Sequence, residues 1–318
     1  LWVFLLYSIL SCWWALVLPA DVVVASSGPI TVGVPGLLAH WLRRKPLIFE
    51  VRDLWPEGAI QTGMLRAPWA IALARWFERL CYQHATTVVA LSPGMAAGIL
   101  QVAPGTHVET ISNAADLDLF HPGHPVPDTV RREANGRFVV LYAGTLGRAN
   151  GTTELVDIAC ELARRGARDV DIVVIGDGAE RAEMERLARQ RGLDRLRFLG
   201  KLPKTDVAAW HEVAALTLCL FKPFPVTGTC SPNKLFDSLA AGRPVVNNTN
   251  GWMAEMLART GSGLSYTAGD VSAAADLILS LRDNAPYARA MGDAARATAE
   301  RDYARDRLAA AFAELFPR

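Results

Sequence analysis

Two glycine-containing segments of this 318-residue chain each carry a cation in a position that suits an anionic ligand. Residues 144–151 read GTLGRANG, and residues 227–237 read TGTCSPNKLFD. Glycine lets a backbone approach a ligand closely, and the first amides of a helix bind anions. Arg148 has the forked donors that suit phosphate, and Lys234 adds a second positive charge. Both segments predict a diphosphate site, and the alternative is a pair of ordinary turns.

The second segment reads as the start of a well-capped helix. Ser231 is expected as the N-cap, Pro232 as the first helical residue, and Gly242 as the C-terminal cap. Lys234 then lies in the first turn, where a cation opposes the helix dipole unless an anion is bound. Asp237, one turn later, could accept hydrogen bonds from sugar or ribose hydroxyls. The alternative is that both charged side chains are simply solvated.

Two further segments follow predicted strands. Residues 50–57 read EVRDLWPE and place Arg52 and Asp53 at a strand end, where charge favours a polar ligand over a structural role. Residues 176–178 read GDG, a triplet that tight turns also use. The glycine spacings match neither the dinucleotide fingerprint nor the P-loop, so those two phosphate motifs are excluded.

Apolar runs alternate with stretches of helical periodicity along most of the chain, which predicts parallel sheets. The predicted strands are 22–26, 47–51, 87–91, 108–111, 138–143, 170–175, 196–200, 216–221 and 245–248. The predicted helices are 31–44, 69–84, 92–100, 152–165, 180–191, 206–214 and 233–241. Right-handed connections between such elements give α/β domains with doubly wound, Rossmann-like parallel sheets. Ligands of these sheets bind beyond the carboxyl ends of the strands, where the segments above fall.

A stretch rich in proline, glycine and charge, residues 121–136, interrupts this alternation and predicts a domain boundary. We expect a first domain at 1–125, a second at 126–300, and a final helix at 301–318 that packs back toward the first. The first domain has four predicted strands where about six are expected, so we expect it to be incomplete.

Composition excludes several classes of ligand. The chain has 33 Lys and Arg against 32 Asp and Glu, so no nucleic acid partner is expected. Its five cysteines form no C-x-x-C pair, and His121 and His124 lack a third ligand, so no metal site is expected. A hydrophobic content of 51% excludes a disordered chain. The oligomeric state is left open.

Residues 1–18 read LWVFLLYSILSCWWALVL and form a helix-length apolar segment. Its length is close to that of a membrane span, but no basic region precedes it and no cleavage site follows, which argues against a signal peptide. A helix that packs on the first domain and dips into a membrane interface is favoured, because Trp2, Trp13 and Trp14 suit that boundary. A membrane span and a buried core helix remain as alternatives.

Taken together, these motifs resemble the family-4 glycosyltransferases, which have the two-domain GT-B architecture. The matching segments are 49–57, 111–120, 142–151, 173–181, 197–203, 231–246 and 250–255. The VRDLWPE and PNKLFD variants resemble the bacterial branch that builds cell-surface polysaccharides, including amino-deoxysugar transferases of O-antigen assembly. The resemblance implies a sugar transfer from a nucleotide donor, with UDP favoured, to a lipid-linked or saccharide acceptor. It also implies retention of configuration without a metal or cofactor, in the cytoplasm at the inner face of the membrane.

The resemblance also implies roles for matching positions. Arg52, Asp53, Arg148 and Lys234 are the expected catalytic residues. The donor would be bound by the 144–147 loop, by the start of the 233–241 helix with its ribose-binding acid, and by two backbone positions near the nucleoside. These expected donor-binding residues are Gly144, Thr145, Leu146, Gly147, Gly178, Leu202, Ser231, Pro232, Asn233, Leu235 and Asp237.

The chain departs from the family pattern in two places. The paired acids of the family would need an acid at position 229, where this chain has Thr229. Nothing before Leu1 supplies the family's first strand and glycine-rich loop, so we expect a piece of a longer enzyme. The alternative function is therefore an inactive protein of the same fold that binds nucleotide-sugars or serves as a scaffold.

Overall fold

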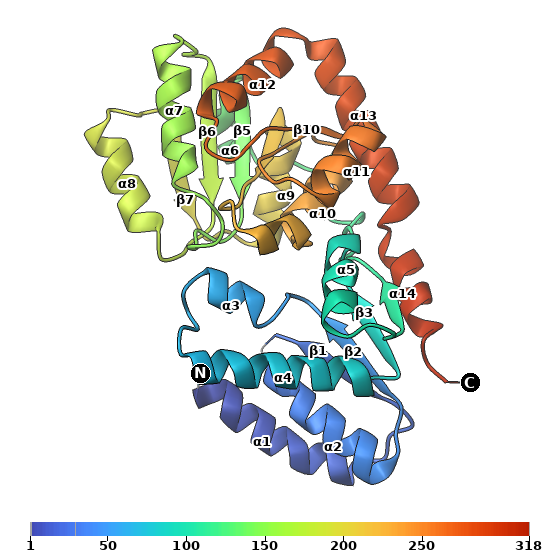
Figure 1. The fold of residues 1–318 in the computed structure, drawn as a ribbon. Coiled ribbons are helices and arrows are strands. Elements are labelled where there is room, and N and C mark those ends of the chain that lie inside the picture. The colour runs from blue at the N-terminus through green and yellow to red at the C-terminus, as the bar shows by residue number, and fades with distance from the viewer. Residues whose placement is uncertain (1, 29, 318) are drawn as a thin grey trace. The chain divides into compact units, whose positions relative to one another are not determined.

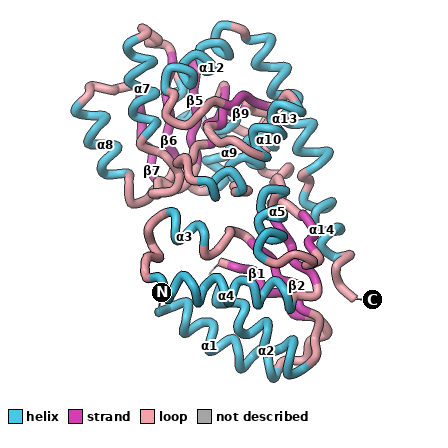
Figure 2. The backbone as a smooth tube through the Cα atoms, in the orientation of Figure 1, coloured by secondary structure: helices cyan, strands magenta, loops and turns pink. Residues whose placement is uncertain are grey.

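The computed structural model describes residues 2–28 and 30–317, with side chains from residue 6 onward. The chain divides into two compact units. The first contains Leu1–Asn113, Thr229–Ser231 and Asp306–Arg318, and the second contains Ala114–Gly228 and Pro232–Arg305. Each unit is a layer of strands covered by helices (Figure 2).

The first unit has a four-stranded parallel sheet in the order β1-β2-β3-β4. Its strands are β1 (Val23–Ser27), β2 (Leu47–Val51), β3 (Thr87–Ala90) and β4 (Val108–Thr110). Its helices are α1 (Trp2–Val17), α2 (Gly33–Arg43), α3 (Glu57–Gln61), α4 (Pro68–His84) and α5 (Pro93–Val102), with most of α14 (Arg305–Ala313). β2 and β3 are almost wholly buried, which is why they read as continuous apolar runs.

The second unit has a six-stranded parallel sheet in the order β10-β9-β8-β5-β6-β7 (Figure 1). Its strands are β5 (Phe138–Ala143), β6 (Val170–Ile175), β7 (Leu196–Gly200), β8 (Leu216–Cys219), β9 (Val245–Asn247) and β10 (Gly263–Ser265). Its helices are α6 (Asp128–Ala134), α7 (Glu154–Arg164), α8 (Arg181–Gln190), α9 (Lys204–Val213), α10 (Asn233–Ala240), α11 (Trp252–Thr260), α12 (Val271–Asp283) and α13 (Ala285–Asp302).

The core of the second unit lies on both faces of its sheet. Val140, Ile172 and Val174 pack with buried side chains of α7, α8 and α12 on one face. Val139 and Val173 pack with α6 and α9 on the other. Strand residues therefore alternate between two apolar layers, as a doubly wound sheet requires.

The structure confirms the predicted fold class of two parallel-sheet α/β domains, and all nine predicted strands are present. The chain between 121 and 136, predicted only as a boundary, contains α6, because Val130 and Ala134 are buried against β5 and β6. The sequence analysis also missed β10, α3 and the helices α11 to α13.

The apolar helix α1 is not the buried core helix that one alternative predicted. Its described side chains include six large apolar ones that are more than half exposed: Leu6, Tyr7, Ile9, Leu10, Trp13 and Trp14. Among the described residues, no helix combines the length and apolar character that a membrane span requires.

Candidate functional site

The strand order of the second unit reverses at β5, which identifies where a ligand should bind. β6 and β7 lie on one side of β5, and β8, β9 and β10 lie on the other. The loops that leave β5 and β8 therefore start next to each other at the carboxyl edge of the sheet. In open α/β sheets this reversal opens a crevice for ligands. Both predicted segments, 144–151 and 227–237, follow these two strands.

Lys234 connects the two segments. Its Nζ donates to the Tyr142 hydroxyl at 3.2 Å and to the Leu220 carbonyl at 3.3 Å. It also lies 4.7 Å from the ring centroid of Tyr142 and 4.5 Å from that of Phe221. Its stem passes close to Gly144, because a Cβ added to that glycine would lie 3.7 Å from Lys234 Cδ. Lys234 thus holds a positive charge at the reversal point, in the first turn of α10.

Tyr142 accepts the hydrogen bond from this lysine through a neutral hydroxyl group. Burial raises its pKa well above the ordinary value for tyrosine. The hydroxyl accepts from Lys234 and donates to the Thr145 carbonyl at 2.9 Å. The last buried strand residue before the loop therefore fixes both the cation and the loop.

The predicted donor loop, residues 144–147, is held by its own backbone. The amide of Gly144 donates to Ile175 at 2.9 Å, and that of Leu146 donates to Asp177 at 3.0 Å. A Cβ on Gly178 would lie 2.3 Å from the Leu146 carbonyl oxygen. Gly178 is therefore required for the contact between two loops, a role that the sequence analysis did not anticipate. The Gly144 and Leu146 amides shape the loop, because they already have acceptors.

The start of α10 differs from the predicted cap. Pro232 is the N-cap, with an extended ψ of 137°, so the helix begins at Asn233 and Pro232 is not its first residue. Ser231 precedes this N-cap by one residue, and its Oγ is buried without a hydrogen-bond partner among the described residues. The Ser231 carbonyl accepts from Asn113 Nδ2 at 2.6 Å. The Leu235 amide donates to the Pro232 carbonyl at 3.1 Å, so this predicted phosphate donor already has an acceptor within the chain.

Asp237 is half-buried on α10, and burial raises its pKa to about 6. The positive charge of Lys204 opposes this rise, and the negative charge of Asp116 adds to it. Lys204 itself pairs with Asp116 at 3.0 Å, as does Arg305 at 2.6 Å. Asp237 can therefore change its charge near neutral pH.

A polar network around β8 and β9 was missed by the sequence analysis. Asn248 accepts from the Phe221 amide at 2.8 Å and donates to its carbonyl at 2.9 Å. It also donates to Glu154 Oε2 at 2.9 Å. Lys222 pairs with Glu180 at 2.9 Å, and Thr152 donates to the same carboxylate at 3.0 Å. The only sign of this network in the sequence was that polar and charged residues directly follow predicted apolar strands.

The remaining predicted residues have separate surroundings. Arg148 is exposed in the turn that follows the donor loop. Leu202 follows β7 and packs partly against the apolar layer of α6 and α9. Arg52 and Asp53 are exposed in the loop after β2 of the first unit, and the Arg52 amide donates to Ser27 Oγ at 3.2 Å. Their catalytic roles stay predictions.

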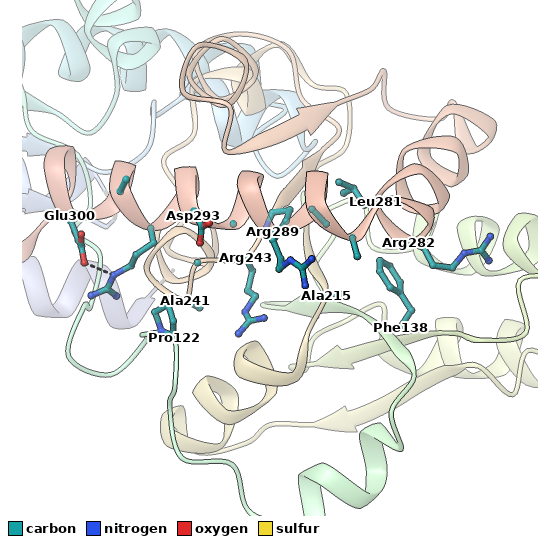
Figure 3. A pocket seen from close by; sticks show the side chains of 17 residues that line it. Pro122, Phe138, Ala215, Ala241, Arg243, Leu281, Arg282, Arg289, Asp293 and Glu300 are labelled. Atoms are coloured by element: carbon teal, nitrogen blue, oxygen red, sulfur yellow. Dashed lines mark hydrogen bonds and ion pairs between the residues drawn. The ribbon is translucent and has the colours of Figure 1, made fainter.

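A cavity of about 540 Å³ lies elsewhere in the second unit, beneath α13 (Figure 3). Phe138, Ala215 and Pro244 line it from the amino ends of β5, β8 and β9, so it lies at the opposite edge of the sheet from Lys234. Several of its arginines are paired, among them Arg296 with Glu300 at 2.6 Å. Within the described ranges 2–28 and 30–317, no three His, Cys, Asp or Glu side chains are grouped to hold a metal ion.

Two family models match the chain, one in each half. Residues 6–114 match a glycosyl transferase 4-like domain, and residues 137–284 match glycosyl transferases group 1. These are the two domains of a GT-B glycosyltransferase. The reversal point with Lys234 lies in the group 1 domain.

Curated glycosyltransferases align over most of the chain. Alpha-maltose-1-phosphate synthase of Mycolicibacterium smegmatis is 25% identical over 288 residues, which are 83% of this chain and 70% of that protein. The lipopolysaccharide core glycosyltransferase LpsD of Rhizobium meliloti is 24% identical over 74% of this chain and 65% of its own length. The probable glycosyltransferase WbjE of Pseudomonas aeruginosa is 26% identical over 81% of this chain and 65% of its own length. The chain thus spans about two thirds of these relatives.

Solved glycosyltransferase structures share the fold. Sucrose-phosphate synthase from Thermosynechococcus elongatus has a TM-score of 0.78 at 18% identity, covering 98% of this chain and 76% of its own. Anabaena HepE in complex with UDP has a TM-score of 0.74 at 18% identity, covering 92% of this chain and 77% of its own. At this identity the likeness establishes the GT-B fold alone.

Replacement of Gly178 by alanine tests the loop packing of this glycosyltransferase. The added Cβ would collide with the Leu146 carbonyl, so we expect a loss of about 1–3 kcal/mol in the free energy of unfolding. Because the collision displaces the 144–147 loop, binding of a nucleotide-sugar donor should weaken as well. Gly58→Ala is the matched control, since its added Cβ meets no atom within 4 Å. Equal melting temperatures and donor affinities for the two variants would contradict the assignment.

Proposed function

We propose that this GT-B protein transfers a sugar from a UDP-sugar to a lipid-linked or cell-surface polysaccharide acceptor. In this proposal the configuration at the anomeric carbon is retained and no metal ion is needed. The observation that supports it most is Lys234, a cation at the strand-order reversal, next to the 144–147 loop and in the first turn of α10. A diphosphate bound there would be balanced by this charge and by the helix dipole.

The relatives support the choice of donor and acceptor. LpsD is named for lipopolysaccharide core biosynthesis, and HepE was solved with UDP. The VRDLWPE and PNKLFD segments resemble the branch that builds bacterial cell-surface polysaccharides, including amino-deoxysugar transferases. We therefore propose a UDP-linked hexose or N-acetylhexosamine as the donor.

The proposed chemistry follows from where charge develops. Transfer breaks the bond between the anomeric carbon and the diphosphate oxygen, and forms a bond from that carbon to an acceptor hydroxyl oxygen. The electron pair of the broken bond stays on the diphosphate. Lys234, Arg148 and the first amides of α10 would stabilise this charge without rearranging. A phosphate oxygen of the leaving group would take the acceptor proton, so the step needs no separate base.

The donor is tested first by its effect on thermal unfolding. Among UDP-, GDP- and ADP-glucose, we expect the UDP-sugar to raise the melting temperature most, because ligands stabilise the folded state by mass action. Transfer is then measured with labelled UDP-N-acetylglucosamine, EDTA and a polyprenyl-diphosphate-linked monosaccharide, and NMR gives the anomeric configuration. Donor binding without transfer or hydrolysis would instead favour a binding protein in which Thr229 replaces a required acid.

Arg148→Ala and Lys234→Ala test the proposed diphosphate contacts. A hydrogen bond to a charged group contributes about 1.5–3 kcal/mol, so each variant should bind UDP-glucose about tenfold to a hundredfold more weakly. Isothermal titration measures the affinity, and circular dichroism checks that the helices are kept. Arg189→Ala removes a well-exposed cation of α8 and should leave the affinity unchanged. An unaltered affinity in the Arg148 variant would remove that residue from the site.

Asp237 predicts a pH dependence of donor binding. If its carboxylate accepts hydrogen bonds from ribose, binding favours the ionised form, so affinity falls as the pH drops through the raised pKa of about 6. The affinity for the donor at pH 5, one unit below this pKa, should therefore be about tenfold lower than the affinity at pH 8. UDP-glucose is the probe, because its phosphate diesters do not titrate in this range. Asp237→Asn should flatten the profile, and an equally steep profile in this variant would contradict the role.

A further inference from the structure

An ion pair between Lys222 and Glu180 connects two loops at the carboxyl edge of the second sheet. The Nζ of Lys222 donates to Glu180 Oε1 at 2.9 Å, and the two side chains are 33% and 14% exposed. Lys222 lies in the chain that follows β8, and Glu180 lies between β6 and α8. Because β5 lies between β6 and β8 in the sheet, the pair joins the chain on the two sides of β5.

Both partners of this pair also bind the loop that leaves β5. The Lys222 amide donates to the Ala149 carbonyl at 2.9 Å. The Glu180 amide donates to the Leu146 carbonyl at 3.0 Å. Arg148 lies between these two attachment points along the chain. The residues that form the ion pair therefore hold the loop on each side of Arg148.

The end of this loop is bound by the same carboxylate. The hydroxyl of Thr152, which is 0% exposed, donates to Glu180 Oε2 at 3.0 Å. Gly151 has a φ of 60°, and a Cβ added there would lie 2.7 Å from the Phe221 carbonyl carbon. The loop thus packs against the backbone just before Lys222, at a point with no room for a side chain.

Arg148 depends on this loop for its place. Its side chain is exposed, and it has no hydrogen bond or ion pair with any residue that the structure describes. The backbone of the loop alone therefore sets where the side chain starts. A binding group works best when the elements that carry it are already rigid before the ligand arrives.

The charges of the pair give this role a sign that can be measured. Through electrostatics alone, loss of the negative charge of Glu180 would strengthen the binding of an anion nearby, and loss of the positive charge of Lys222 would weaken it. Holding the loop has a different consequence, because either change breaks the same ion pair. Both changes should then weaken the binding of the anion.

We propose that Glu180 and Lys222 are positioning residues for donor binding. Their ion pair holds the loop of residues 144–152 in the shape in which Arg148 meets the donor diphosphate. Neither side chain needs to touch the donor. This inference rests on the proposed function, because it uses the contact between Arg148 and the diphosphate.

Glu180→Gln and Lys222→Met test the pair in the full chain. Each variant keeps the approximate length of the side chain and removes its charge, so each should lower the affinity for UDP-glucose about threefold to tenfold in isothermal titration. The double variant should bind no more weakly than the weaker single variant, since either change already breaks the pair. Glu183→Gln is the matched control on α8, because it removes an acid from the exposed pair with Arg186 and should keep full affinity.

Arg148→Ala supplies the background that separates positioning from direct contact. If the pair acts through Arg148, Glu180→Gln should cause no further loss of affinity in that background. Hydrogen exchange of the chain without ligand gives a second measurement. The amides of residues 144–152 should exchange faster in Glu180→Gln and at the unaltered rate in Glu183→Gln.

Circular dichroism shows whether each variant keeps its helices. Thr152→Val is the milder variant should a change at the pair unfold the chain, because it removes one hydrogen bond to Glu180 and keeps the shape of the side chain. It should still speed exchange in the loop and weaken UDP-glucose binding.

Several results would overturn the inference. They are an unchanged or higher affinity of Glu180→Gln, a further loss in the Arg148→Ala background, and unaltered exchange of the loop in the folded variants. No binding of UDP-glucose by the unaltered chain would instead refute the proposed donor. The exchange rates would then still decide whether the pair holds the loop.

Discussion

The positive charge of Lys234 is the constraint on which the candidate site depends. A lysine in the first turn of α10 opposes the helix dipole, and it lies beside the buried strand β8. The protein offsets this with the Leu220 carbonyl, the Tyr142 hydroxyl and two aromatic faces. These groups bind a cation without neutralising it. An anionic ligand at the start of α10 would lie next to this positive charge.

The sheet order places that charge at the edge where a ligand is expected to bind. Because β5 is flanked by β6 on one side and β8 on the other, the chain after β5 and the chain after β8 must diverge around a crevice. The two glycines after β6 then bring a second loop against the first. A Cβ on Gly176, whose φ is 139°, would lie 1.9 Å from the Gly144 carbonyl oxygen. These two glycines are thus required for the contact between the loops, independently of any ligand.

The sequence predicted the features that depend on neighbours along the chain. Buried strands such as β6 and the cation-bearing loops after β5 and β8 were found from periodicity and glycine content. What it missed depends on which strands pair. Asn248 could not be linked to Phe221, 27 residues away, before β8 and β9 were known to be neighbours. The Ser231 cap failed for a local reason, because Pro232 keeps an extended backbone and delays the helix by one residue.

Helix α1 shows that the sequence can indicate which face of an apolar helix packs inward even where hydropathy does not. From its apolar content the sequence analysis favoured an interfacial helix and kept a membrane span and a buried core helix as alternatives. The smaller residues Ser8, Ser11, Cys12 and Ala15 recur at helical spacing, and the structure turns this stripe toward α2 and the turn before it. Small residues allow close helix packing, so their stripe identifies the inner face. The large apolar residues are then outside by geometry, which means that hydrophobicity alone cannot say which face of such a helix is buried.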